Sequence, residues 1–439
     1  MERKLAGINV VVVGMARSGV AAVDLLRQKG AMVRAVDEKA TGEVEGVRIE
    51  PQNEAAFRDA ELVVISPGVP ADLDLLQRVR TRGVTVIGEL ELAAPFLQGK
   101  TIGITGTNGK TTTTALTGHI LRESGIACQV GGNIGTPPAA MVASSLPGQW
   151  NVLELSSFQL ETIQTFRADI AVCLNITQNH LDRHHTFEGY VNAKARLFEM
   201  QQAGDVAVLN ADDATTVSLA DRAPLRTLWF SGTHQVVGAW LDRESIFLDG
   251  ERLLDVRQLR LRGRHNYENV MAAALVAREA GALPPQIAHA AATFAPVEHR
   301  LELVREIAGV NYYNDSKATS VDATLKALDA FSGGLWVILG GKDKGSDYTA
   351  LREPLRAKAH AALLIGAAAS KVADHLDDAV PLVQCGTLSV AVAMAHDAAR
   401  PGDTVLLAPA CASFDQFESY EQRGLVFKEL VSQLAEGNA

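Results

Sequence analysis

The sequence predicts an α/β protein of three domains, in which helices cover mostly parallel sheets. Short apolar runs alternate with helical patterns along all 439 residues, and such alternation is typical of parallel sheets. Glycine-rich or polar loops follow many of these runs, at the strand ends where α/β proteins bind ligands. A domain usually has roughly 100–200 residues, so this length fits two to four domains.

The composition is that of an ordinary globular protein, with 47% hydrophobic and 21% charged residues. The 41 basic and 51 acidic residues give a net charge of −10, which argues against general affinity for nucleic acid or anionic membranes. The four cysteines form no C-x-x-C pair, so neither a zinc site nor a redox motif is indicated. The apolar run near the N-terminus is too short to span a membrane and lacks a signal-peptide cleavage pattern. A cytoplasmic location is therefore expected.

The first block, residues 1–94, is predicted to be a Rossmann-like domain. Its first strand leads into the turn Gly14-x-Ala16-x-x-Gly19, and Asp37 ends the next strand, where a ribose-binding acid would lie. Ala16 replaces the second glycine and hinders the approach of a pyrophosphate. A nucleotide site and a tight turn without a ligand therefore fit equally well. An NAD-dependent oxidoreductase is the corresponding alternative function, but it leaves the loop described next unexplained.

The second block, residues 95–296, is predicted to be a P-loop ATPase-type domain with a mostly parallel sheet. A glycine-rich loop at 103–112 follows a strand and opens a helix, so its backbone N–H groups and the helix N-terminus can bind phosphate. Lys110 would reach the terminal phosphates, and the Thr111 hydroxyl would bind Mg²⁺. The spacing departs from the standard G-x-x-x-x-G-K-[ST], because the glycines stand at 103 and 106.

Four further residues of this block are candidates for metal binding or catalysis. Glu154 ends a strand and suits a Mg²⁺ ligand, although a solvated acid is more common at such a position. His180 is the histidine nearest the end of the following strand. Asn133 lies in a glycine-rich loop that could approach phosphate or form a simple turn. Lys194 lies on a predicted helix and, taken alone, is expected to be a surface lysine.

The third block, residues 297–439, is predicted to be a second Rossmann-like domain. Polar loops at 314–319, 340–344 and 408–415 each follow a predicted strand. Three such loops at one sheet edge indicate a binding face, with a solvated loop edge as the alternative.

Taken together, six motifs resemble those of the Mur ligase family. In chain order they are GTNGKTT at 106–112, ELSSFQLE at 154–161, NHLDRH at 179–184, NDSKATS at 314–320, LGGKDKG at 339–345 and APACASFDQFESYEQRG at 408–424. The resemblance covers the whole chain in order. The first and third motifs are shared widely among Mur ligases and folylpolyglutamate synthases, whereas NDSKATS and the last motif resemble the D-glutamate-adding members.

The resemblance implies ATP-dependent ligation of D-glutamate to UDP-N-acetylmuramoyl-L-alanine through an acyl phosphate, a cytoplasmic step of peptidoglycan precursor synthesis. The expected partners are these small molecules, with no nucleic acid or membrane, and the chain is expected to be a monomer. Another Mur ligase or a folylpolyglutamate synthase-like enzyme with a different acceptor is one alternative. A non-catalytic nucleotide-binding regulator is another, against which the presence of Lys110, Glu154 and His180 argues.

The resemblance also implies individual roles, with the first block holding the uridine nucleotide and the third holding the amino acid. ATP contacts are implied for Gly106, Thr107, Asn108, Gly109, Lys110, Thr111, Thr112, Asn266, Asn269, Arg300, Asp315 and Lys317. Contacts with the UDP substrate are implied for Ser18, Asp37, Gly68, Asn133, Ser156 and His180. Contacts with D-glutamate are implied for Thr319, Lys344, Ser413, Phe414 and Tyr420. The implied catalytic residues are Lys110, Asn133, His180 and Lys194.

Two Mg²⁺ ions are the implied cofactors besides ATP. Their implied ligands are Thr111, Glu154, His180 and a carbamylated Lys194. Carbamylation would turn the lysine ammonium into an anionic oxygen ligand, which is the kind that Mg²⁺ prefers.

Overall fold

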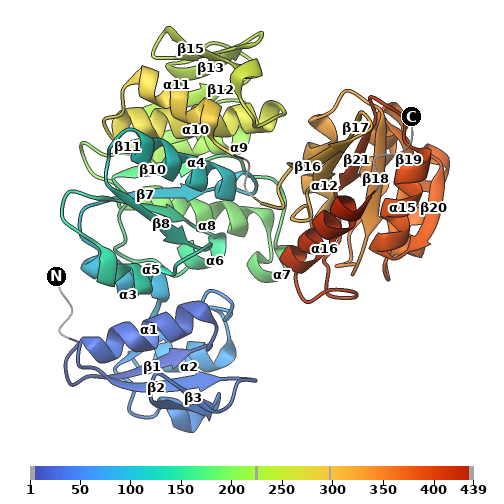
Figure 1. Ribbon diagram of the computed structural model, residues 1–439. Coiled ribbons are helices and arrows are strands. Elements are labelled where there is room, and N and C mark those ends of the chain that lie inside the picture. Colours follow the sequence, from blue (N-terminus) through green and yellow to red (C-terminus); the bar gives the residue numbers. More distant parts are fainter. Residues whose placement is uncertain (1–4, 223–225, 296–297, 435–439) are drawn as a thin grey trace. The chain divides into compact units, whose positions relative to one another are not determined.

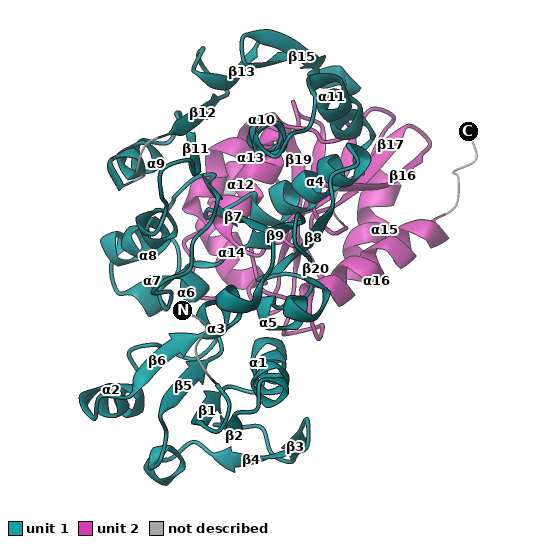
Figure 2. Cartoon of the chain, turned by 90° about the vertical axis from the view of Figure 1, so that its left-hand side faces the viewer, with its two compact units in different colours: residues 1–259, 268–294 teal, residues 260–267, 295–439 magenta. Residues whose placement is uncertain are grey.

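The computed structural model describes residues 5–222, 226–295 and 298–434 (Figure 1). Its three sheets are mostly parallel, so the predicted α/β class is confirmed. The chain divides into two compact units, of which unit 1 comprises Met1–Leu259 and Glu268–Phe294, and unit 2 comprises Arg260–Tyr267 and Ala295–Ala439 (Figure 2). The first predicted block and most of the second thus lie together in unit 1, while Arg260–Tyr267 of the second block belong to unit 2. The domain bounds 1–94, 95–296 and 297–439 stay a prediction.

The N-terminal sheet has the strand order β3-β4-β2-β1-β5-β6, and only β3 and β4 pair antiparallel. Its centre is apolar because Val10–Val13 of β1 are all buried, and Ala22, Val23 and Leu26 form a buried stripe on the first helix. The elements are β1 (Asn9–Val13), α1 (Arg17–Gln28), β2 (Met32–Asp37), β3 (Glu43–Val44), β4 (Val47–Pro51), β5 (Leu62–Ile65), α2 (Asp74–Thr81), β6 (Thr85–Gly88) and α3 (Glu89–Ala93).

The central sheet has the order β15-β14-β13-β12-β11-β10-β7-β9-β8, parallel except for the β13–β15 meander. Its strands are β7 (Lys100–Thr105), β8 (Cys128–Gly132), β9 (Trp150–Glu154), β10 (Ile170–Cys173), β11 (Val206–Asn210), β12 (Thr227–Ser231), β13 (Gly238–Asp242), β14 (Ser245–Leu248) and β15 (Glu251–Asp255). Its helices are α4 (Lys110–Glu123), α5 (Pro138–Met141), α6 (Ser157–Leu160), α7 (Leu181–His184), α8 (Phe187–Glu199), α9 (Ala214–Ser218), α10 (Arg264–Glu279) and α11 (Pro284–Thr293).

The strand order of this sheet places the phosphate loop. Strand β7 lies between β10 and β9, and its register pairs Ile104 with Glu154 and Thr105 with Cys173. The loop that leaves β7 therefore starts beside the ends of two neighbouring strands. This is the edge at which parallel sheets bind ligands.

The sheet of unit 2 has the order β16-β17-β21-β18-β19-β20, with only β16 antiparallel. Its elements are β16 (Glu302–Ile307), β17 (Val310–Asn314), α12 (Val321–Asp329), β18 (Leu335–Gly340), α13 (Arg352–Lys358), β19 (Ala359–Ile365), α14 (Ala369–Leu376), β20 (Leu382–Gly386), α15 (Leu388–Ala398), β21 (Thr404–Leu407) and α16 (Tyr420–Gln433). Because β21 lies between β17 and β18, the three polar loops predicted at strand ends leave adjacent strands.

Apolar clusters fill both faces of the N-terminal sheet and of the sheet of unit 2. In unit 2, Val337 and Leu339 of β18 belong to one cluster while Ile338 belongs to the other, as expected for a strand covered on both sides.

Across the described residues, every helix is too short or too polar to cross a membrane.

Candidate active site

The phosphate loop between β7 and α4 requires glycine at two positions. Gly106 has φ +149°, and Gly109, the N-cap residue directly before α4, has φ +83°. A Cβ atom at Gly109 would lie 2.3 Å from Oδ1 of Asn269, so the close approach also excludes a side chain there. Because these glycines carry no side chain, the backbone N–H groups at the start of α4 can face a bound anion.

Asn175, just after β10, holds this loop in place. Its Oδ1 accepts a hydrogen bond of 2.9 Å from the Asn108 N–H, and its carbonyl accepts one of 2.8 Å from the Thr107 N–H. The Thr107 hydroxyl lies 3.1 Å from the hydroxyl of Tyr190 on α8. The segment after β10 and helix α8 therefore hold the loop conformation.

Two lysines converge on the carbonyl groups of the loop. Lys110 Nζ donates to the carbonyls of Gly106 and Thr107, at 2.9 and 2.8 Å. Lys194 Nζ donates to the same Gly106 carbonyl at 2.9 Å and to Thr105 Oγ1 at 3.3 Å. Lys194 is only 1% exposed, so the expectation of a surface lysine is wrong. Helical periodicity did not show that this position of α8 faces the sheet.

The environment of Lys194 favours its neutral amine. Burial and then the nearby charge of Lys110 lower the pKa of Lys194 well below its usual range. A neutral amine is the form that adds to CO₂, so the setting fits carbamylation. The carbamate itself stays a prediction.

Glu154, at the end of β9, carries a buried carboxylate that is half satisfied. Its Oε1 accepts a hydrogen bond of 2.9 Å from Asn133 Nδ2, while its buried Oε2 has no hydrogen-bond partner in the described part of the chain. Leaving such an oxygen unsatisfied costs roughly 1–3 kcal/mol or more, so a cation is expected there. Thr111, buried on the first turn of α4, and Lys194 are the further predicted ligands in this part of unit 1. The donor set therefore fits Mg²⁺.

His180 lies on the surface before α7. It is exposed and has φ +53°, and its ring lies 4.9 Å from the ring of Phe158. The nearby His184 is instead buried, with Nε2 2.9 Å from Ser157 Oγ. Of these two histidines, His180 is the one that a ligand can reach.

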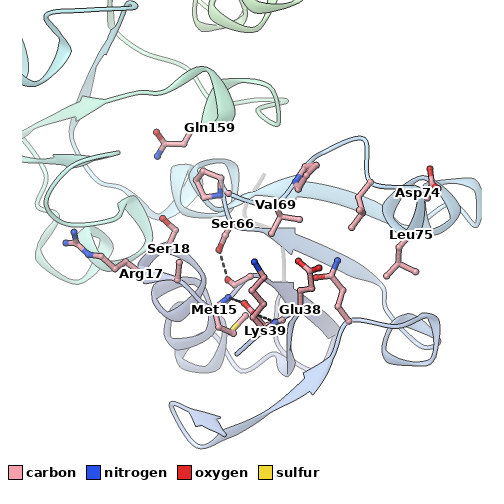
Figure 3. Close-up of a pocket in the computed structure, with 18 of the residues that line it drawn as sticks. Met15, Arg17, Ser18, Glu38, Lys39, Ser66, Val69, Asp74, Leu75 and Gln159 are labelled. Atoms are coloured by element: carbon pink, nitrogen blue, oxygen red, sulfur yellow. Dashed lines mark hydrogen bonds between the residues drawn. The ribbon is translucent and has the colours of Figure 1, made fainter. Parts of the chain in front are cut away.

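A cavity of about 850 Å³ opens at the ends of the N-terminal strands (Figure 3). Ser18, Asp37, Gly68 and Asn133 line it, which are four of the six residues predicted to bind the UDP substrate. The other two, Ser156 and His180, are not among its lining residues. The Ser156 hydroxyl instead caps α6, accepting from the Gln159 N–H at 3.3 Å and donating to Gln159 Oε1 at 3.1 Å.

Asp37 organises the floor of this cavity. Its carboxylate accepts hydrogen bonds from the N–H groups of Met15 and Ala40, both at 2.7 Å, and of Lys39, at 2.8 Å. Burial raises the pKa of Asp37, but these hydrogen bonds outweigh it, so the pKa ends below its usual value. The ionised carboxylate binds backbone N–H groups of two turns, and it can still accept a hydrogen bond from a hydroxyl group of a ligand.

In unit 2 the three polar loops meet. Lys342 and Ala412 exchange two backbone hydrogen bonds, of 2.8 and 3.1 Å. The fully buried Arg423 of α16 donates to the carbonyl oxygens of Ser316, at 2.9 Å, and Cys411, at 3.2 Å. The convergence predicted from the three strand ends is therefore present in the fold.

The residues predicted to bind D-glutamate all lie on these loops or at the start of α16. Ser413 is buried, Thr319 and Tyr420 are half-buried, and Lys344 and Phe414 are exposed. The set thus combines a buried hydroxyl with an accessible cation.

The predicted nucleotide contacts outside the phosphate loop lie in both units. Asn269 in unit 1 accepts a hydrogen bond of 3.2 Å from Thr113, and Asn266 in unit 2 donates one of 2.6 Å to the Arg262 carbonyl. Burial raises the pKa of Asp315 to about 7, although the charge of Arg300 lowers it. Lys317 Nζ lies 5.4 Å from the centre of the Tyr420 ring.

Three models of Mur ligase domains match the chain, each over a separate segment. They are the "Mur ligase MurD-like, N-terminal domain" over residues 8–88, the "Mur ligase middle domain" over 104–277 and the "Mur ligase, glutamate ligase domain" over 299–411. A UDP-N-acetylmuramoylalanine--D-glutamate ligase of Solibacter usitatus is 60% identical and covers 98% of this chain and 99% of its own.

The chain belongs to the Mur ligase family.

Two further relatives agree with this membership. The UDP-N-acetylmuramoylalanine--D-glutamate ligases of Acidobacterium capsulatum and Koribacter versatilis are 50% and 49% identical, over 98% of this chain and 97% and 98% of theirs. Among solved structures, a pseudomurein peptide ligase of Methanothermus fervidus has a TM-score of 0.61 at 18% identity, covering 98% of this chain and 100% of its own. A UDP-N-acetylmuramate-alanine ligase of Thermotoga maritima has a TM-score of 0.62 at 19% identity, covering 97% and 99%. These structures show the shared fold, and the family resemblance of the six motifs is confirmed.

In this Mur ligase, four residues at these sites were not predicted. Tyr190 supports the phosphate loop, and the Lys194 Nζ lies 4.7 Å from the centre of its ring. Gln159 lines the N-terminal cavity (Figure 3), and its buried Nε2 has no hydrogen-bond partner in the residues described. Asn175 and Arg423 are the other two. Gln159 and Arg423 lie inside two of the six motifs, so the sequence could have indicated them. Tyr190 and Asn175 lie outside the motifs, and nothing in the sequence indicated them.

Proposed function

We propose that the chain is an ADP-forming ligase that joins D-glutamate to UDP-N-acetylmuramoyl-L-alanine in peptidoglycan precursor synthesis. One arrangement supports the chemistry. The carbonyl groups of the phosphate loop accept hydrogen bonds from two lysines, and the neighbouring strand ends at Glu154, whose buried Oε2 has no hydrogen-bond partner in the described residues. The assignment of the substrates is supported by relatives named UDP-N-acetylmuramoylalanine--D-glutamate ligase at 49–60% identity.

ATP would bind along the loop from Gly106 to Thr112. The backbone N–H groups and the start of α4 favour the phosphates, and Lys110 would exchange its two carbonyl partners for phosphate oxygens. Asn266, Asn269, Arg300, Asp315 and Lys317 complete the proposed ATP contacts. Phosphoryl transfer needs positioning and charge neutralisation more than covalent help from the protein.

Thr111, Glu154, His180 and carbamylated Lys194 are the proposed Mg²⁺ ligands. Bound Mg²⁺ would supply positive charge where the transferred phosphoryl group develops negative charge. Asn133 holds Glu154 Oε1 and so orients its other oxygen. Tyr190 and Asn175 keep the loop in the conformation that this arrangement needs.

The UDP substrate would occupy the N-terminal cavity, where Ser18, Asp37, Gly68, Asn133 and Gln159 line the walls. The start of α1 favours its pyrophosphate, and Asp37 is placed for a hydroxyl. Ser156 is also a proposed contact with this substrate, although its hydroxyl caps α6 in this structure.

The reaction then has two steps. A carboxylate oxygen of the substrate attacks the γ-phosphorus of ATP, so that ADP leaves and an acyl phosphate forms. The D-glutamate amine attacks the acyl carbon, loses a proton and expels inorganic phosphate. Lys344 would pair with an acceptor carboxylate as a point charge, with the acceptor also contacting Thr319, Ser413, Phe414 and Tyr420. We further propose that the chain works as a monomer in the cytoplasm.

The test is phosphate release with ATP, Mg²⁺ and UDP-N-acetylmuramoyl-L-alanine, adding D-glutamate, L-lysine, meso-diaminopimelate or L-alanine in turn. Release with D-glutamate alone, together with the matching peptide product, is the expected result. Release with another amino acid would keep the ligase chemistry and change the acceptor. No release with any of them, from folded protein that binds ATP, would overturn the proposal in favour of a binding protein.

A further inference from the structure

Asp343, the residue before Lys344, has the most fully bonded carboxylate of the loop after β18. Its Oδ1 accepts from the Tyr348 hydroxyl at 2.7 Å and from the Ser346 N–H at 3.1 Å. Its Oδ2 accepts from Lys371 Nζ at 2.7 Å. Both oxygens are therefore held, by the loop itself and by helix α14.

The groups that hold this carboxylate are themselves anchored. Tyr348 is fully buried, and its hydroxyl also lies 3.0 Å from Sγ of Cys411. Its backbone N–H donates to Nδ1 of His375 at 3.1 Å, and Lys371 Nζ lies 5.7 Å from the centre of its ring. Oδ1 of Asp343 is thus bound to a fully buried side chain, while Oδ2 is bound to the partly exposed Lys371.

The start of the loop is fixed as well. Lys342 pairs with Ala412 through two backbone hydrogen bonds, and a Cβ at Gly341 would lie 2.2 Å from the Ala412 carbonyl oxygen. Since consecutive Cα atoms are about 3.8 Å apart, fixing Asp343 restricts the Cα of Lys344 to a small region. The long lysine side chain can then sample only the volume in reach of that point.

The charge balance of the loop also depends on Asp343. Burial raises the pKa of Asp343, but hydrogen bonds from Lys371, Tyr348 and the backbone of Ser346 and Gly345 outweigh it and hold the pKa far below its usual range. The carboxylate is therefore ionised and offsets the charge of Lys371.

We propose that Asp343, held by Tyr348 and Lys371, is a positioning residue that places Lys344 for the carboxylate of the incoming amino acid. The inference rests on the proposed function, in which Lys344 binds that carboxylate. A flexible lysine contributes to affinity only as far as its backbone is placed in advance, because ordering it on binding costs conformational entropy. The network places Lys344 in that way before the acceptor arrives.

The test uses the full-length enzyme and steady-state kinetics for each of the three substrates. Asp343→Asn keeps the size of the side chain but loses the charge, and Tyr348→Phe removes only the hydroxyl. Each should raise the KM for D-glutamate about tenfold, as expected for a lost charge-assisted hydrogen bond, and change the KM for ATP less than twofold. Glu353→Gln, which removes an exposed carboxylate paired with Arg356, is the matched control and should change neither KM.

A double variant separates a shared network from general loosening. If Asp343 and Lys371 act as one unit, Asp343→Asn combined with Lys371→Met should raise the KM for D-glutamate no further than the larger single effect. Equal rises in all three KM values, or a lower melting temperature with an unchanged KM for D-glutamate, would overturn the inference. A wild-type enzyme without D-glutamate-dependent turnover would instead overturn the proposed function.

Discussion

The side-chain amide of Asn133 donates a hydrogen bond of 2.9 Å to Oε1 of Glu154 and leaves the buried Oε2 of that carboxylate without a partner in the described chain. Glu154 ends β9 and Asn133 directly follows the neighbouring strand β8, whose last residue, Gly132, pairs with Glu154. The amide therefore presets the direction of the unsatisfied oxygen before any cation binds.

Glu154→Gln tests the metal role of that oxygen. The amide keeps the size of the side chain but is a poor Mg²⁺ ligand, so kcat should fall on the order of 10²-fold or more, with a higher Mg²⁺ requirement. Titration of activity against Mg²⁺ measures both. Glu199→Gln, on the exposed end of α8, is the control and should behave as wild type. Wild-type Mg²⁺ dependence in Glu154→Gln would remove this residue from the metal site.

Carbamylation of Lys194 should be directly visible. Because its amine is buried and its pKa is lowered, Lys194 should add CO₂ and show a carbamate signal in ¹³C NMR with labelled bicarbonate. Lys194→Met should lose that signal, and its activity should fall on the order of 10²-fold or more. Lys110→Met should lose activity but keep the signal. A signal that persists in Lys194→Met would assign the carbamate elsewhere.

Gly109→Ala tests the geometry of the phosphate loop. The new Cβ would lie 2.3 Å from Asn269 Oδ1 at φ +83°, so both ATP affinity and stability should fall. Gly125→Ala is the matched control, because Gly125 has φ +74° but nothing within 4 Å of its Cβ. Both variants should lose roughly 1–2 kcal/mol from the left-handed backbone. Only Gly109→Ala should also lose ATP binding in calorimetry, and an equal loss in both variants would contradict this.

Gln159→Glu tests the unpartnered donor in the N-terminal cavity. The substitution keeps an oxygen that can accept from the Ser156 N–H, replaces the buried Nε2 donor by a second oxygen and adds a negative charge. The KM for the UDP substrate should rise at least about tenfold, because a hydrogen bond is lost and the new carboxylate repels the pyrophosphate, while the KM for ATP stays unchanged. An unchanged KM for the UDP substrate would show that Gln159 only caps the helix.

Because of Glu89, at the start of α3, the free energy of unfolding should fall as the pH rises. Burial raises the pKa of Glu89 to about 8, against the lowering effect of a hydrogen bond from the Ala139 N–H. The folded state thus keeps a proton that the unfolded state releases near pH 4.5. Its stabilising contribution is complete below that pH and is lost as pH rises through 8.

Glu89→Gln removes this titration. Its advantage in unfolding free energy over wild type should grow between pH 5 and pH 8, on the order of a few kcal/mol, in denaturant titrations. Glu251→Gln, at an exposed position of β15, should show no such trend. A constant difference between Glu89→Gln and wild type across this range would place the pKa of Glu89 outside it.

Strands were predicted well where they are apolar on both faces. The apolar runs Leu62–Ile65 and Thr404–Leu407 predict two strands, which the structure has with the same bounds. The sequence also predicts a last helix from about Tyr420 to Leu434, and α16 ends at Gln433, one residue earlier. The β13–β15 meander and β16 were not predicted. Antiparallel strands that expose one face, such as Glu251–Asp255, carry charged residues and show no apolar run.

By itself, the sequence determined the α/β class, the loops at the ends of the predicted strands and the residue types that those loops present, because alternation, glycines and motifs depend on neighbours along the chain. Only the tertiary structure decided that Lys194 is buried against Gly106 and that one oxygen of Glu154 is left unsatisfied. These properties depend on desolvation by residues distant in sequence. Lys194, which was expected to be a surface lysine of its helix, is buried against the phosphate loop for that reason.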